Sequence, residues 1–283
     1  MDTLVASPAQ VPAATGPTRF TLVRILLALL AVCVPVALLM VVAQQIPDKE
    51  LRAYWPALLA ALVGYGGYAF YVRRIESRTA TELGRPFGRE LGAGLLLGAV
   101  LFLAILGLLA VAGVYRPSGT GDWTVLLKSA SEMVFVAMVE EILFRGVLFR
   151  LPERSLGSKA ALLVSSVIFA LAHIPNENAT VLAVANTAVA GLLFAAAYLA
   201  TRRLWLPIGM HFAWNFTSDG LFSLPTSGHP PRGLLQGQLS GPEWLTGGAY
   251  GLEGSALTFA VMSIATFLLL RRAQRAGHFL PKP

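Results

Sequence analysis

The sequence contains the run LGAGLLLGAVLFLAILGLLAVAGVY at residues 91–115. No Asp, Glu, Lys or Arg interrupts this run. A helix needs roughly 20 apolar residues to cross the hydrocarbon core of a bilayer, where each peptide group must be hydrogen-bonded within the segment. The run therefore predicts a transmembrane helix and points to a membrane protein.

The composition of the whole chain agrees with this interpretation. Of its 283 residues, 55% are hydrophobic and 13% are charged, whereas soluble domains carry roughly 25% charged residues. A soluble protein could not bury so much apolar surface and still present a charged exterior. The composition excludes a soluble enzyme, a nucleic-acid-binding protein and a disordered protein. Cys33 is the single cysteine, which excludes an intrachain disulfide and a cysteine zinc site.

The apolar runs predict an all-α bundle of about eight transmembrane helices. One integral membrane domain, residues 19–275, would follow a disordered tail, residues 1–18, and precede a short tail, residues 276–283. We expect the two shortest runs, 159–175 and 204–218, to line a protein interior or a cavity rather than lipid. The runs lie at 25–43, 55–72, 91–115, 123–150, 159–175, 179–199, 204–218 and 255–270.

The basic residues indicate an orientation. With eight spans, most of the 22 Lys and Arg residues fall on the side that holds both termini. Positive loops stay in the cytoplasm, so we predict cytoplasmic termini. The alanine-rich, lysine-poor composition suggests a bacterial inner (plasma) membrane. We expect the basic segment 73–90 to lie along the membrane surface, with lipid headgroups as a second contact. Many Gly, Pro and Ser residues predict a long loop at 219–254.

Ionisable side chains inside apolar runs are costly and mark candidate functional sites. One run holds Glu140, Glu141 and Arg145. Glu141 and Arg145 share a helix face four residues apart, so we expect them to pair. Glu140 is rotated by about 100° from Glu141 and lies away from that partner. On the same run, Lys128 and Glu132 are expected to form a local ion pair.

Three further polar side chains lie in later runs. His173 is in one, and His211 and Asn215 share a helix face in another. At about 1.5 Å per residue from the basic helix ends, these three and Glu140 fall in a layer about 9 Å thick. A carboxylate and a histidine in a dry cavity can activate water, and a second histidine with an amide can stabilise an oxyanion. The arrangement indicates hydrolysis of an acyl bond.

Three motifs carry a resemblance to a known family. EEILFR (140–145), FALAH (169–173) and HFAWN (211–215) resemble the EExxxR, FxxxH and HxxxN motifs of the CPBP family. This is the CAAX-protease and bacteriocin-processing group of intramembrane endopeptidases, which includes the type II CAAX prenyl endopeptidases. The family's eight-helix plan agrees with the number of apolar runs. The motif region covers roughly a quarter of the chain, and the order of the motifs makes the resemblance specific.

The resemblance implies an intramembrane endopeptidase whose partners are a membrane-associated protein or peptide substrate and the lipid bilayer, with no nucleic acid. Glu140 and His173 would activate the attacking water, and His211 and Asn215 would stabilise the oxyanion. The residues that would hold the site together are Glu141 and Arg145. The substrate stays open among a prenylated CAAX tail, a bacteriocin-type leader and a C-terminal sorting tail.

The resemblance leaves the metal open. A glutamate and two histidines could bind zinc, with Glu140, His173 and His211 as ligands. We expect no metal and no other cofactor, because the Asn215 amide beside His211 suits an oxyanion better than a zinc ion.

Other classes are less well supported. GTGD (119–122) matches a pattern of intramembrane aspartyl proteases, but no second Asp lies in an apolar run, so Asp122 is expected to cap the next helix. The GxSxG and HExxH motifs of serine and zinc proteases are absent. A non-catalytic membrane protein with an immunity, scaffold or transport role is the alternative. The intact motifs favour the enzyme.

Overall fold

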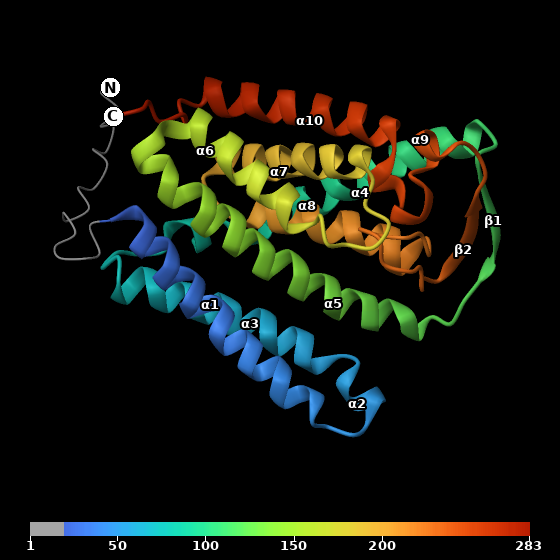
Figure 1. Cartoon of the computed structure of the whole chain (residues 1–283), viewed down its shortest axis with the longest axis horizontal. Coiled ribbons are helices and arrows are strands. Elements are labelled where there is room, and N and C mark those ends of the chain that lie inside the picture. Colours follow the sequence, from blue (N-terminus) through green and yellow to red (C-terminus); the bar gives the residue numbers. More distant parts are fainter. Residues whose placement is uncertain (1–19) are drawn as a thin grey trace.

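The computed structural model describes residues 20–283, and helices dominate it (Figure 1). The fold is an all-α membrane bundle, as predicted. The predicted tail at residues 1–18 lies outside the described residues. The long helices are α1 (Thr21–Gln44), α3 (Trp55–Arg74), α4 (Phe87–Val111), α5 (Thr124–Glu141), α6 (Arg150–Ala172), α7 (Val181–Thr201), α8 (Trp205–Asn215) and α10 (Ala256–Arg275). The short elements are α2 (Lys49–Arg52), α9 (Glu243–Thr246), the 3-10 helices η2 (Thr81–Leu83), η5 (Gly248–Tyr250) and η6 (Leu252–Gly254), and the π-helical segments η3 (Ile142–Phe149) and η4 (Phe216–Leu221).

Six helical stretches between residues 20 and 283 are long and apolar enough to cross a membrane. The predicted number of eight is therefore not confirmed. Two predicted runs, 123–150 and 159–175, fall within one stretch of 49 residues, Thr124–Ala172, which joins α5, η3 and α6. A third, 204–218, forms the short α8 and the beginning of η4.

Gly157 interrupts the helical backbone of the long stretch. Its φ of 75° and ψ of 164° lie outside the helical range, in a region that side-chain-bearing residues rarely adopt. A Cβ at this position would lie 2.8 Å from the backbone nitrogen of Lys282. The break in the helix and the close approach of the chain near its C-terminus therefore both require a glycine here.

Helix α8 is an interior helix, as its short apolar run predicted. Nine of its eleven residues are buried. Glycines allow the backbones of α4 and α8 to touch, since a Cβ on Gly94 or Gly98 would meet a carbonyl oxygen of α8 at 2.3 Å. Such small residues let membrane helices approach closely. For the run 159–175 the prediction holds on one face only. Helix α6 buries Phe169 but leaves Leu163 and Leu171 more than half exposed on its outer face.

Strands β1 (Tyr115–Thr120) and β2 (Leu235–Leu239) form a two-stranded antiparallel ribbon that the sequence did not predict. Figure 1 places the ribbon at the opposite end of the bundle from the C-terminus. At the start of α5, the side chain of Asp122 accepts a hydrogen bond from the Thr124 amide at 2.9 Å, in line with the predicted capping role. The predicted loop at 219–254 thus contains β2 and short helical turns.

Candidate active site

A buried ion pair lies at the end of α5. Glu141 is fully buried and Arg145 is 1% exposed. Arg145 Nη1 donates to Glu141 Oε1 at 2.7 Å, and Nη2 donates to the Gly191 carbonyl of α7 at 3.1 Å. The guanidinium carbon lies 4.7 Å and 5.1 Å from the ring centroids of Phe169 and Phe194. The expected Glu141–Arg145 pair is therefore present, and it links α5 to α6 and α7.

His211 of α8 is bound to the same carboxylate. Its Nδ1 lies 2.9 Å from Glu141 Oε1, and its ring stacks on Phe194 at a centroid distance of 4.7 Å. A carboxylate accepts hydrogen bonds, so Nδ1 carries a proton. The Nε2 atom is then the nitrogen available for chemistry. The sequence analysis assigned Glu141 only to Arg145 and missed this second contact.

His173 follows the last residue of α6. Its Nδ1 donates to the Phe169 carbonyl at 2.7 Å, and its ring lies 4.5 Å from that of Phe169. Four residues separate the two, so the FxxxH spacing brings the imidazole onto the last turn of its own helix. The carbonyl partner places the proton on Nδ1 of His173, as the carboxylate does for His211, and leaves Nε2 available.

Glu140 and Asn215 share a cavity with the two histidines. The cavity has a volume of about 260 Å³ and is lined by Glu140, His173, His211 and Asn215. Glu140 Oε2 is buried and has no hydrogen-bond partner. Asn215 is 7% exposed, and within residues 20–283 no hydrogen bond engages its side-chain amide. Buried polar groups are normally satisfied, so such atoms are available for water or substrate.

The loop after α8 supplies the rest of the cavity wall. Asp219, His229 and Arg232 also line it. Asp219 accepts hydrogen bonds from Ser129 Oγ at 2.6 Å and from Arg232 Nε at 3.2 Å. Arg232 also pairs with Glu132. No sequence motif indicated that Asp219, His229 and Arg232 belong to the site.

The expected local ion pair between Lys128 and Glu132 was wrong. Glu132 forms its ion pair with Arg232, a hundred residues away in the sequence. Helical spacing on α5 could not reveal this partner, because Arg232 lies on a different segment of the chain that lines the same cavity.

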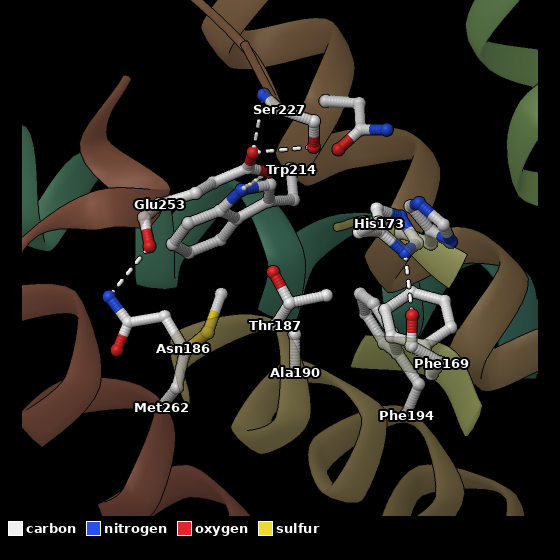
Figure 2. A pocket seen from close by; sticks show the side chains of 12 residues that line it. Phe169, His173, Asn186, Thr187, Ala190, Phe194, Trp214, Ser227, Glu253 and Met262 are labelled. Carbon is white, nitrogen blue, oxygen red and sulfur yellow. Dashed lines mark hydrogen bonds between the residues drawn. The ribbon is translucent and has the colours of Figure 1, made fainter. Parts of the chain in front are cut away.

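A smaller pocket adjoins the main cavity and shares His173, His211 and Asn215 with it. Figure 2 shows Glu253 of η6 in its wall. The Glu253 carboxylate accepts hydrogen bonds from Trp214 Nε1 at 3.0 Å, from the Ser227 amide at 2.6 Å and from the Ser227 hydroxyl at 2.7 Å. Glu253 thus ties the loop to α8 beside Asn215, a role that no sequence motif indicated.

A metal ion in this site would need several His, Cys, Asp or Glu side chains close together. Among the described residues, no three His, Cys, Asp or Glu side chains are grouped as metal ligands. The zinc set proposed from the sequence, Glu140, His173 and His211, is not among such groups, and the metal dependence of the protein stays a prediction.

The arrangement of these residues agrees with a family comparison. Residues 122–217 match the family described as type II CAAX prenyl endopeptidase Rce1-like. Over these residues the chain is similar to that family. The matched segment is about a third of the chain and contains all three motifs. The match confirms the resemblance to CAAX proteases and supports the prediction of a membrane protease. No curated protein and no solved structure matches the chain.

Proposed function

We propose that the chain is an intramembrane endopeptidase that hydrolyses a peptide bond of a membrane-associated substrate with a glutamate-activated water. The observation that carries the proposal is the shared cavity of Glu140, His173, His211 and Asn215. These side chains come from three segments far apart in the sequence. The proposed substrate is a peptide close to the membrane. The candidates are a prenylated CAAX tail, a bacteriocin-type leader and a C-terminal sorting tail.

Glu140 is the general base in this proposal. Its unpartnered Oε2 can accept a proton from water, and His173 Nε2 can accept the second hydrogen bond of the same water. The water oxygen attacks the peptide carbonyl while Glu140 takes its proton. Glu140 then gives this proton to the leaving amine as the C–N bond breaks, so the carboxylate is regenerated.

Asn215 and His211 stabilise the oxyanion that forms. The Asn215 amide lines the cavity and has two N–H donors and no competing partner among the described residues. His211 Nε2 donates only when the imidazole is protonated, and the Glu141 carboxylate at Nδ1 offsets the charge of that form. Donors aimed at a developing oxyanion contribute strongly in a dry site. The membrane that holds this site is proposed to be a bacterial inner membrane.

The proposal is tested by comparing the membrane proteomes of cells that carry the wild-type protein or its Glu140→Gln variant. Removing the base should slow cleavage by about 10²- to 10⁴-fold, so one precursor accumulates. The matched control is Glu177→Gln, which makes the same chemical change on an exposed residue near His173. It should process the precursor normally.

Purified wild-type protein should then cleave that precursor equally well after complete metal removal by a chelator. Normal processing by Glu140→Gln, at wild-type protein levels, would contradict the role of Glu140. Loss of cleavage on metal removal, restored by zinc, would replace the glutamate mechanism with a metal mechanism.

A further inference from the structure

A second polar cavity lies away from the candidate active site. It has a volume of about 220 Å³ and lies where the segment after α3, the beginning of α6 and the end of α7 meet the chain near its C-terminus. Four arginines line it, namely Arg78, Arg150, Arg154 and Arg202. None of them belongs to the catalytic cavity.

Three of these arginines already have carboxylate partners. Arg78 binds both oxygens of Glu82, at 2.8 Å and 2.6 Å, and Arg150 binds both oxygens of Glu76, at 3.0 Å and 3.1 Å. The third partner pair is Arg202 with Glu153, at 2.6 Å. These pairs build a rigid wall whose charges balance one to one.

Arg154 is the cation without a partner. Within residues 20–283 its guanidinium forms no ion pair and no hydrogen bond, and the side chain is exposed at the mouth of the cavity. The four arginines that line the cavity therefore exceed by one the three carboxylates that pair with them. An arginine fork of this kind matches the geometry of a phosphate group.

Tyr198 is a second, independent observation. The residue is 3% exposed and lines the same cavity, yet no hydrogen bond among the described residues engages its hydroxyl. The hydroxyl is not one of the fully buried polar atoms that lack a partner, so it is accessible from the cavity. A ligand with oxygen acceptors would supply the missing partner and would meet Arg154 at the same time.

We propose that this cavity binds a phosphate group, carried by an anionic phospholipid headgroup or by free inorganic phosphate, with Arg154 and Tyr198 as the contacting residues. The cavity adjoins the polar segment after Arg73 and Arg74, the basic last turn of the apolar helix α3. This is the level at which basic pockets between membrane helices meet lipid headgroups. The inference does not rest on the proposed protease function.

Thermal unfolding of the full-length protein tests the site in uncharged detergent. Phosphatidylglycerol added to the micelles should raise the melting temperature of the wild type, because a ligand that binds the folded state stabilises it. Phosphatidylcholine, which has no net charge, should have a much smaller effect. Inorganic phosphate alone forms the third arm, and stabilisation by phosphate at millimolar concentration would identify a free anion as a ligand.

Arg154→Gln and Tyr198→Phe should each weaken the anionic-lipid effect, the former by about tenfold in the lipid concentration required. Lys159→Gln is the matched control, since it removes one exposed positive charge five residues away and should respond as the wild type does. Native mass spectrometry of retained phosphatidylglycerol gives a readout independent of stability.

Equal responses of wild type and Arg154→Gln to both phosphatidylglycerol and phosphate would overturn the proposal. So would an equal loss in Lys159→Gln, since that result would indicate general surface charge rather than a site.

Discussion

At the scale of single residues, Asn215 differs from its neighbours in the site because no hydrogen bond among the described residues engages its side-chain amide. The amide is buried in the cavity, while Glu141, Arg145 and His211 are tied together by hydrogen bonds. A side chain that makes no structural hydrogen bond contributes little to folding through that group. Its effect on catalysis can therefore be separated from its effect on stability.

Asn215→Ala should reduce the rate of cleavage by about 10²- to 10³-fold, the usual cost of losing one oxyanion donor. The melting temperature should change little, because no hydrogen bond within the described part of the chain is lost. Asn215→Asp should be at least as slow as Asn215→Ala, since a negative charge repels the oxyanion. A large fall in melting temperature with little change in rate would assign Asn215 to packing.

Sequence spacing predicted the contacts that lie within one helix and missed those that cross between segments. The Glu141–Arg145 pair follows from a separation of four residues. The bond from His211 to Glu141 joins residues 70 positions apart, and the bond from Trp214 to Glu253 joins residues 39 apart. Such partners depend on tertiary packing, so a single sequence supplies no period that reveals them.

At the scale of elements, the contact between α4 and α8 positions the chemistry. Gly98 lies against the Met210 carbonyl, and Met210 directly precedes His211. A side chain at Gly98 must push α8 away, because the atom it would meet is backbone rather than a flexible side chain. His211 and Asn215 would move with the helix.

Gly98→Ala should destabilise the protein by about 1–3 kcal/mol, the usual cost of overpacking, and should also slow cleavage. Gly107→Ala is the matched control on the same helix, because no atom lies within 4 Å of its added Cβ. The measurements are thermal unfolding and the rate of precursor cleavage. Equal behaviour of the two variants would show that the close approach of α4 and α8 is not needed.

The segment after α3 is held to the bundle by a charge cluster that acid should disrupt. Burial raises the pKa of Glu82, but the hydrogen bond from Arg78 and the charge of Arg150 lower it more strongly, to about 2. In the unfolded chain the carboxyl would titrate near 4.5. The unfolded state therefore binds more protons between these two pH values, and stability falls as pH falls through this window.

The melting temperature of the wild type should drop between pH 5 and pH 2, with about 3 kcal/mol of stability from Glu82 lost over this range. Glu82→Gln has no carboxyl to titrate and should be less stable at pH 6 but show a shallower acid dependence. The check is a series of unfolding curves in detergent across this range. Parallel pH profiles for the two proteins would contradict the assignment to Glu82.

The elements that the sequence predicted well are those with long, uninterrupted apolar runs. Helix α4 occupies Phe87–Val111, close to the run at 91–115. The predictions failed where local structure departs from an ideal helix, at the π-helical η3, the break at Gly157 and the β1–β2 ribbon. A π-helix and a ribbon between distant segments leave no simple period in the sequence.

At the scale of the whole molecule, the basic residues predict which end of the bundle faces the cytoplasm. The ribbon and the last residues of α10 lie at opposite ends (Figure 1). In intact cells of a Cys33→Ser background, a cysteine at Gln238 of β2 should react with a membrane-impermeant maleimide. A cysteine at Arg275 should react only after the membrane is opened, because positive loops remain inside.

Labelling of the Arg275 position in intact cells would reverse the predicted orientation. Both positions are exposed, so a difference in labelling reports sidedness rather than burial. The same experiment fixes which face of the membrane lies closer to the catalytic cavity.

The hydrogen bonds that the chain near its C-terminus forms beside the Gly157 break also constrain the order in which the protein folds during synthesis. Ser158 and Leu280 exchange hydrogen bonds at 3.0 Å and 2.8 Å, and His278 Nδ1 donates to the Leu199 carbonyl at 2.7 Å. Residues 278–280 are synthesised after every helix of the bundle. During translation, α6 and α7 must therefore enter the bilayer before the hydrogen bonds from residues 278–280 can form. Helix α6, which precedes His173, is held by these bonds only after α10 has been synthesised.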